Sequence, residues 1–134
     1  MFDDTIKNNI SYARPSASDD EIMKACVFAA ADEFIKKLPK SYDTMIGENG
    51  VRLSGGQYKR IALARTFYFG KKIIVMDEAT NSLDLDSEKY IMEQVNELKN
   101  KKTIIIITHR LDILKNCNKI YKIENKKINL MEEK

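Results

Sequence analysis

Two short runs of apolar residues do most to limit what this chain can fold into. They are Ile73-Ile74-Val75-Met76 and, later in the chain, Ile104-Ile105-Ile106-Ile107. The segment between them, residues 87–100, carries apolar residues at helical spacing. Neighbouring parallel strands need a crossover connection, which is usually a helix. A strand, a helix and a strand in this order therefore predict two parallel strands in an α/β second half.

The first half of the chain is predicted to be mainly helical. Residues 3–13 have apolar residues at helical spacing, with Asp3 and Asp4 as candidate caps. Ser18 and Glu21 have the spacing of a capping box at the start of a second helix, which is expected to end near Lys36 and Lys37, before Pro39. These residues together favour a small helical unit.

The remaining elements are predicted from local signals. Residues 44–50 contain two glycines that could take positive φ, which indicates a loop. A helix is expected over 58–69 and should stop at Gly70. Residues 111–115 suit a short helix, and residues 120–128 suit two strands around a polar turn.

Composition predicts one soluble domain. The chain has 134 residues, 43% of them hydrophobic and 32% charged, with a net charge of +3. Its apolar runs are far shorter than the roughly 20 residues that cross a bilayer, so we expect no membrane insertion by this chain itself. The basic C-terminal part lacks stacked aromatic residues, which favours a solvated surface over nucleic-acid binding. Cys26 and Cys117 lie far apart with one histidine in the chain, which argues for reduced thiols and against a zinc site.

The segment Leu53-Ser54-Gly55-Gly56-Gln57 has the features of an anion clamp. Ser54 and Gln57 have capping-box spacing, so the two glycines would open a helix. Exposed N–H groups at the positive end of a helix dipole, with no side chains in the way, favour a phosphate oxygen. The alternative is an ordinary turn with a helix cap.

Two acids follow the first apolar run. Asp77 and Glu78 would lie at the C-terminal end of a strand, where ligands gather in open α/β sheets. We expect Asp77 to hold Mg²⁺, through water, and Glu78 to polarise the water that attacks a γ-phosphate. A solvated acidic turn is the simpler alternative.

His109 follows the second apolar run. If the two strands are parallel neighbours, His109 emerges on the same sheet edge as Asp77 and Glu78, which would place it near a phosphate. The turn Ser82-Leu83-Asp84 would lie near the same ligand, and either Asp84 or Asp86 could also cap the next helix. The chain contains no Gly-x-x-x-x-Gly-Lys-Ser/Thr phosphate loop, so these residues make half of an ATP site.

From Phe2 to Ile128, these motifs together resemble the nucleotide-binding domain of ATP-binding cassette (ABC) transporters. Residues 53–57 are similar to its signature motif, 73–77 to its Walker B strand and 82–84 to its D-loop. Residues 2–10 and 44–50 look like the exporter branch.

The resemblance implies a role for each motif. Glu78 would be the catalytic glutamate, and His109 the switch histidine. Asp77 would bind Mg²⁺, and the D-loop would lie at a dimer interface. The signature residues would contact ATP in trans, and they are Leu53, Ser54, Gly55, Gly56 and Gln57.

The implied fold is a P-loop NTPase-like (RecA-like) parallel sheet of the α/β class with an inserted helical subdomain. Residues 1–70 would form that signature subdomain, and residues 71–134 the C-terminal half of the ATPase core. The sheet would be incomplete, because the Walker A half is expected to be missing and the chain looks like a C-terminal fragment. Its two strands would then carry unpaired apolar edges, so we expect an isolated chain that is destabilised, oligomeric or rearranged.

The implied activity is ATP hydrolysis coupled to transport, with ATP and Mg²⁺ as cofactors, at the cytoplasmic face of a membrane. The implied partners are a second nucleotide-binding domain arranged head to tail, the transmembrane domains of an exporter, and the missing Walker A half. The chain alone is expected to be inactive. Two alternatives stay open: a non-catalytic module that donates the signature motif in trans, and a truncated remnant. The transported substrate is not determined by these residues.

Overall fold

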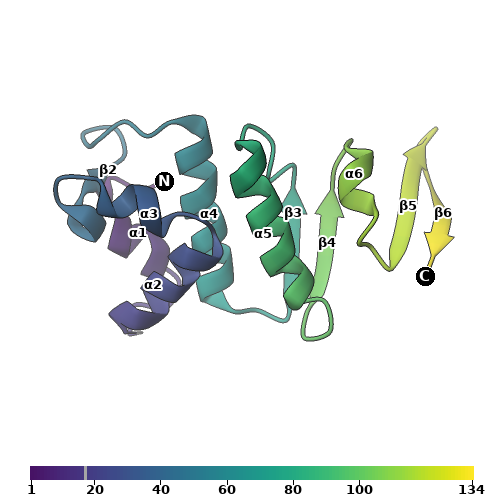
Figure 1. Cartoon of the computed structure of the whole chain (residues 1–134), viewed down its shortest axis with the longest axis horizontal. Coiled ribbons are helices and arrows are strands. Elements are labelled where there is room, and N and C mark those ends of the chain that lie inside the picture. The colour runs from purple at the N-terminus through teal and green to yellow at the C-terminus, as the bar shows by residue number, and fades with distance from the viewer. Residues whose placement is uncertain (17) are drawn as a thin grey trace.

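The structure is a computed structural model that describes residues 1–16 and 18–134. Figure 1 shows helices at the N-terminal end, a central α/β part and a C-terminal hairpin. In chain order the elements are β1 (Asp4–Thr5), α1 (Ile6–Ser11), α2 (Asp19–Phe28), α3 (Asp32–Lys36), a 3₁₀ turn (Ser41–Asp43), β2 (Met45–Ile46), α4 (Gly55–Phe69), β3 (Ile73–Asp77), α5 (Leu85–Glu97), β4 (Thr103–Ile107), α6 (Leu111–Leu114), β5 (Lys119–Glu124) and β6 (Lys127–Glu133).

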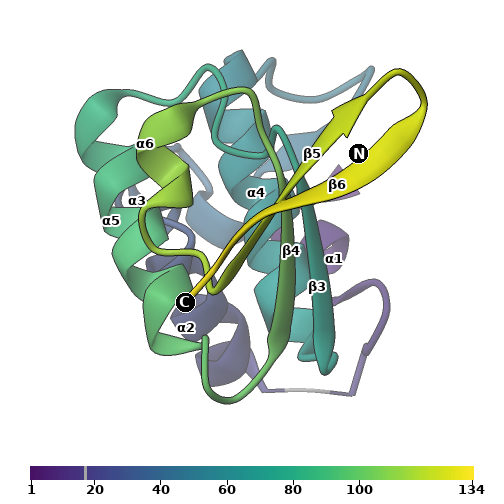
Figure 2. The same ribbon diagram turned by 90° about the vertical axis from the view of Figure 1, so that its right-hand side faces the viewer.

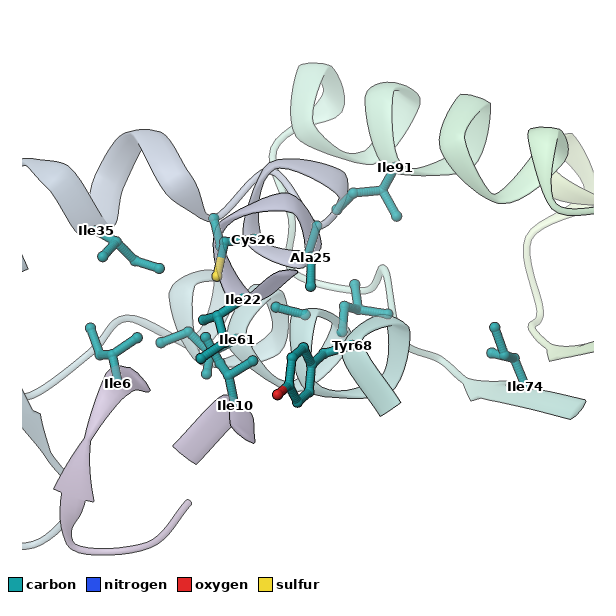
Figure 3. Close-up of a cluster of buried hydrophobic side chains, with 14 of the residues drawn as sticks. Ile6, Ile10, Ile22, Ala25, Cys26, Ile35, Ile61, Tyr68, Ile74 and Ile91 are labelled. Atoms are coloured by element: carbon teal, nitrogen blue, oxygen red, sulfur yellow. The ribbon is translucent and has the colours of Figure 1, made fainter. Parts of the chain in front are cut away.

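Helix α4 lies at the centre of the hydrophobic core. Its Ile61 and Ala64 are fully buried, and Tyr68 is nearly so. Figure 3 shows Ile61 and Tyr68 among side chains of α1 and α2, with Ile91 of α5 on a neighbouring side. One continuous core therefore joins the helical half to the α/β half.

Polar side chains of α4 also tie it to the N-terminal segment. Arg65 Nε donates to the Asn9 carbonyl at 2.7 Å, and Tyr68 Oη donates to the Arg14 carbonyl at 2.8 Å. Asn9 is fully buried, and its side-chain Nδ2 donates to the carbonyls of Phe2 and Thr5, both at 3.0 Å. These bonds satisfy polar groups that would otherwise be buried without partners.

Two of the predicted helices differ from the observed ones in a way that has a clear physical cause. Thr5 caps α1 by accepting from the Asn8 N–H, so the prediction of Asp3 or Asp4 as the cap is wrong. Asp3 instead accepts bonds from Asn49. The Ser18 capping box is confirmed, but α2 ends at Phe28 because Ala30 takes a φ of 53° in the left-handed region.

The loop over residues 44–50 is confirmed in part. It contains β2, which pairs antiparallel with β1. Gly47 has the expected positive φ, 114°. Gly50 does not, and is needed for another reason: a Cβ there would overlap the carbonyl of Met45.

Strands β3 and β4 are parallel neighbours, as the crossover pattern predicts. Ile74 pairs with Ile104 and Asp77 with Ile107. Ile74 and Met76 point into the core. The opposite face is half exposed, because Ile73, Val75, Ile105 and Ile107 keep 48–60% of their surface. Among the described residues no further strand pairs with either edge, so the expected unpaired edges are present.

The C-terminal hairpin is confirmed and lies apart from β4, beyond α6 (Figure 1). Its turn uses Asn125 and Lys126 at φ 51° and 61°. Both central residues of a type I′ turn need positive φ, which asparagine tolerates better than lysine. Figure 2, which looks from the hairpin end, shows β5 and β6 in front of the other elements.

No helix of the described residues is both long and apolar enough to span a bilayer.

Candidate functional site

The candidate residues gather at one edge of the molecule. Figure 1 shows that β3 and β4 end at the same edge at which α4 and α5 begin. Parallel strands expose their carboxyl ends together, and helices that follow them start nearby. This topology brings Ser54, Glu78, Ser82 and His109 to one side.

Ser54 forms the N-cap of α4 in a complete capping box. Its hydroxyl accepts from the Gln57 N–H at 3.2 Å, and the Gln57 amide oxygen accepts from the Ser54 N–H at 3.0 Å. A hydroxyl that accepts keeps its own proton available for another acceptor. A Cβ built on Gly55 would meet no atom within 4 Å. The first turn of α4 is therefore open to an anion.

Gly56 brings the segment over residues 53–57 against the turn over residues 82–84. A Cβ at Gly56 would lie 3.1 Å from the Ser82 carbonyl oxygen and 3.7 Å from a methyl group of Leu83. Leu53 and Leu83 are partly buried against the core. The two glycines thus differ in their surroundings. Gly55 faces open space at the helix start, and Gly56 permits close packing against the turn over residues 82–84.

The turn itself is well defined. Ser82 has a φ of 70°, in the left-handed region. Asp84 is the N-cap of α5, since its carboxylate accepts from the Ser87 N–H at 2.9 Å. That backbone hydrogen bond holds the pKa of Asp84 below its usual value. Of the two candidate caps, Asp84 is therefore the one used.

Glu78 is held at its backbone and at its carboxylate. Its N–H donates to the Ile107 carbonyl at 3.0 Å, which extends the β3–β4 ladder by one bond. Its carbonyl accepts from Lys59 Nζ at 3.1 Å. Its carboxylate accepts from Asn81 Nδ2 at 2.9 Å. These partners hold a residue whose φ is 45°, a conformation that costs roughly 1–2 kcal/mol in a non-glycine residue.

His109 contacts the second carboxylate oxygen of Glu78. The distance from His109 Nδ1 to Glu78 Oε1 is 3.1 Å, and both side chains are more than half exposed. An ionised carboxylate only accepts, so a neutral imidazole in this pair carries its proton on Nδ1. The expectation that His109 and Glu78 share a sheet edge is confirmed.

Asp77 ends β3 on the exposed face of the strand. Among the described residues no group of three or more His, Cys, Asp or Glu side chains could hold a metal ion. Mg²⁺ often uses only one or two carboxylates, with waters and substrate phosphates as its other ligands. Asp77 fits such a ligand, and residues 1–16 and 18–134 supply no complete cage.

The sequence did not single out four residues that support these groups. Lys59 and Asn81 hold Glu78, while Arg110 and Glu88 form an ion pair beside His109. Asn81 lies three residues after Glu78, and Arg110 directly follows His109, so their closeness in sequence could have identified them as neighbours of the site. The pairing of Lys59 with Glu78, and of Glu88 with Arg110, depends on the tertiary structure.

Comparison with known proteins gives consistent matches. The profile described as ABC transporter matches residues 3–81. An ATP-dependent lipid A-core flippase of Legionella pneumophila (strain Lens) is 48% identical over 128 residues, which cover 96% of this chain and 22% of the flippase. The chain thus spans about a fifth of that relative's length.

A solved structure has the same fold over most of the chain. It is described as a bacterial Atm1-family ABC exporter with ATP bound, and it superposes with a TM-score of 0.84 at 40% identity. The match covers 90% of this chain and 21% of the exporter. The fold is therefore that of part of an ABC exporter's nucleotide-binding domain.

The segment over residues 53–57, the paired strands that carry Glu78 and His109, and the two matches agree: this chain belongs to the ABC transporter family, in which it is similar to a flippase and to an exporter.

Proposed function

We propose that this chain forms part of the ATP-hydrolysing domain of an exporter. In this proposal residues 1–70 form the helical signature subdomain, and residues 71–134 form the C-terminal half of the ATPase core. The whole domain works at the cytoplasmic face of a membrane with ATP and Mg²⁺. The contact between His109 and Glu78, at the edge where α4 begins, is the observation that carries the proposal.

Glu78 acts as the group that orients and polarises the attacking water. Its bonds to Asn81 and His109 fix its carboxylate before a substrate arrives, and preorganised groups need no rearrangement during the reaction. His109 is more than half exposed, and when both of its ring nitrogens carry a proton, Nε2 donates to a phosphate oxygen while Nδ1 donates to Glu78. Asp77 supplies one ligand, through water, for Mg²⁺, which neutralises phosphate charge when it is bound with ATP.

The open start of α4 binds phosphate on a second nucleotide-binding domain. Ser54 retains a hydroxyl proton, Gly55 is unobstructed, and the helix dipole favours a negative ligand. Leu53 and Gln57 shape the same segment, and residues 82–84 lie beside it at the domain interface. The phosphate loop comes from a polypeptide segment other than these 134 residues, which contain no such motif.

Complementation tests this proposal. The chain is mixed with a half-domain that carries a phosphate loop, and phosphate release from Mg·ATP is measured. We expect each component to be inactive alone and the mixture to hydrolyse ATP. Glu78→Gln should abolish hydrolysis, whereas Glu124→Gln in the exposed hairpin pair Lys122–Glu124 should not affect it. Tight ATP binding and hydrolysis by the chain alone would contradict the division of the site.

A non-catalytic role as a donor of the signature segment is the second candidate. The complete capping box and the open Gly55 favour it, because they form a phosphate-binding surface without any help from Glu78. The same assay separates the two functions. If the Glu78→Gln chain restores hydrolysis as well as the parent chain does, the chain supplies only the signature segment.

A further inference from the structure

An ion pair between α5 and the residue after His109 stands out among the contacts near the site. Arg110 Nη1 lies 2.5 and 2.6 Å from the two carboxylate oxygens of Glu88. The Glu88 side chain is only 7% exposed, and that of Arg110 is 31% exposed. A carboxylate this deeply buried is costly without a cationic partner, so the pair strongly favours one position for Arg110.

The other groups of Arg110 are also held. Its Nη2 donates to Asp112 at 2.8 Å, and its N–H donates to the Thr108 hydroxyl at 3.0 Å. Arg110 is thus fixed through its backbone and through both ends of its guanidinium. His109 lies between Thr108 and Arg110, so these bonds hold its backbone beside Glu78.

Glu88 in turn connects this segment to the turn over residues 82–84. Its N–H donates to the Asp84 carbonyl at 2.9 Å in the first turn of α5. Glu88 therefore joins the start of α5, which follows that turn, to the residue next to His109.

We infer that Glu88 and Arg110 are positioning residues that hold His109 against Glu78 and couple this contact to the 82–84 turn. The inference deepens the proposed function and rests on it for its catalytic meaning. The contact itself can be tested without any hydrolysis.

The test uses the one histidine of the chain. The ¹⁵N chemical shifts of its imidazole are measured in the parent chain, in Glu78→Gln, in Glu88→Gln and in the double variant. We expect Glu78→Gln to move the His109 signals in the parent chain and to lose this effect in the Glu88→Gln background. In the Glu124→Gln background the effect of Glu78→Gln should be retained.

A merely structural Glu88 would give a different result. Glu88→Gln would then lower the melting temperature, but Glu78→Gln would still move the His109 signals by the same amount, and that outcome overturns the inference. A parent chain in which Glu78→Gln leaves His109 unchanged also overturns it.

A second variant covers the case in which Glu88→Gln does not fold. Replacing both partners, with Glu88→Leu and Arg110→Met, removes the ion pair without leaving a buried charge unpaired. The same loss of coupling between Glu78 and His109 is expected. These measurements need no ATP, so the two proposals can fail separately. If Glu88→Gln leaves the effect of Glu78→Gln on the His109 shifts unchanged while complementation still depends on Glu78, only the positioning role is overturned. If the coupling is lost as expected but complementation does not depend on Glu78, the proposed function is overturned.

Discussion

The two glycines at the start of α4 allow the proposed phosphate contact of this segment to be tested separately from its structural role. Gly55→Ala adds a methyl group where no atom lies within 4 Å, whereas Gly56→Ala places one 3.1 Å from the Ser82 oxygen. Neither glycine has a positive φ, so alanine fits the backbone at both positions. The same chemical change thus meets open space at one residue and a tightly packed turn at the next.

The expected effects follow from these distances. Gly55→Ala should stabilise the folded chain by about 0.4–1 kcal/mol, since alanine has less freedom to lose on folding. That free energy corresponds to a rise of about 1–4 °C in the melting temperature of a domain of this size. At Gly56 the turn must move by a few tenths of an ångström, which offsets this gain. Gly56→Ala should therefore melt below Gly55→Ala.

Complementation should rank the two variants differently. The new methyl group of Gly55→Ala occupies the space through which a phosphate oxygen reaches the N–H groups, so ATP hydrolysis by the mixture should fall about a hundredfold. Circular dichroism melts and phosphate-release rates provide the two measurements. A Gly55→Ala chain that is stabilised and still fully active would refute the assignment of this helix start as the phosphate contact.

Three further predictions concern stability, and a fourth concerns association. Burial raises the pKa of the Cys26 thiol from 9.0 to about 12, so the folded state resists ionisation that the unfolded state undergoes. The chain should therefore lose stability as pH rises from about 9 towards 12, and denaturant titrations should show a smaller loss in Cys26→Ala. Ile91→Ala should cost about 2–5 kcal/mol in the same titrations, and Ile105→Ala, at a half-exposed site, less than about 1.5 kcal/mol. Lys126→Gly should stabilise the hairpin by about 1 kcal/mol, because glycine adopts this positive φ without strain, and hydrogen exchange of β5 and β6 should become slower. Light scattering should show association of the parent chain that decreases with Val75→Thr, and a monomeric parent with a cooperative melt would contradict this expectation.

Local signals were sufficient to predict much of the fold. The capping boxes at Ser18 and Ser54 and the helix stop at Gly70 are all present, because each depends on residues within one helical turn. Gly70 ends α4 at a φ of 69°, as a residue without a Cβ can. The break at Ala30 was not predictable from its own sequence. Alanine gives no turn signal, and the Ala30 carbonyl is held by Arg60 from α4.

The site was predictable in its main groups and not in its supports. Glu78 and His109 follow apolar runs, so strand direction alone brought them to one edge. The bond from Lys59 to the Glu78 carbonyl spans 19 residues of sequence and joins two elements. Neither residue type predicts that contact, because the ammonium group of an exposed lysine can form its hydrogen bonds with water instead. Contacts of this kind can be identified only from the tertiary structure.

The two apolar strands have the sequence pattern of strands buried on both faces, although one of their faces is exposed in this chain. A strand with one face in solvent alternates apolar and polar residues, whereas a strand buried on both faces is apolar throughout. Residues 73–76 and 104–107 have the second pattern, yet Val75 and Ile105 keep about half of their surface exposed. The chain spans only about a fifth of the relatives it matches. The face that carries Val75 and Ile105 therefore has the composition of an interior surface. Covering it in a complementation experiment should stabilise the same strands that position Glu78 and His109.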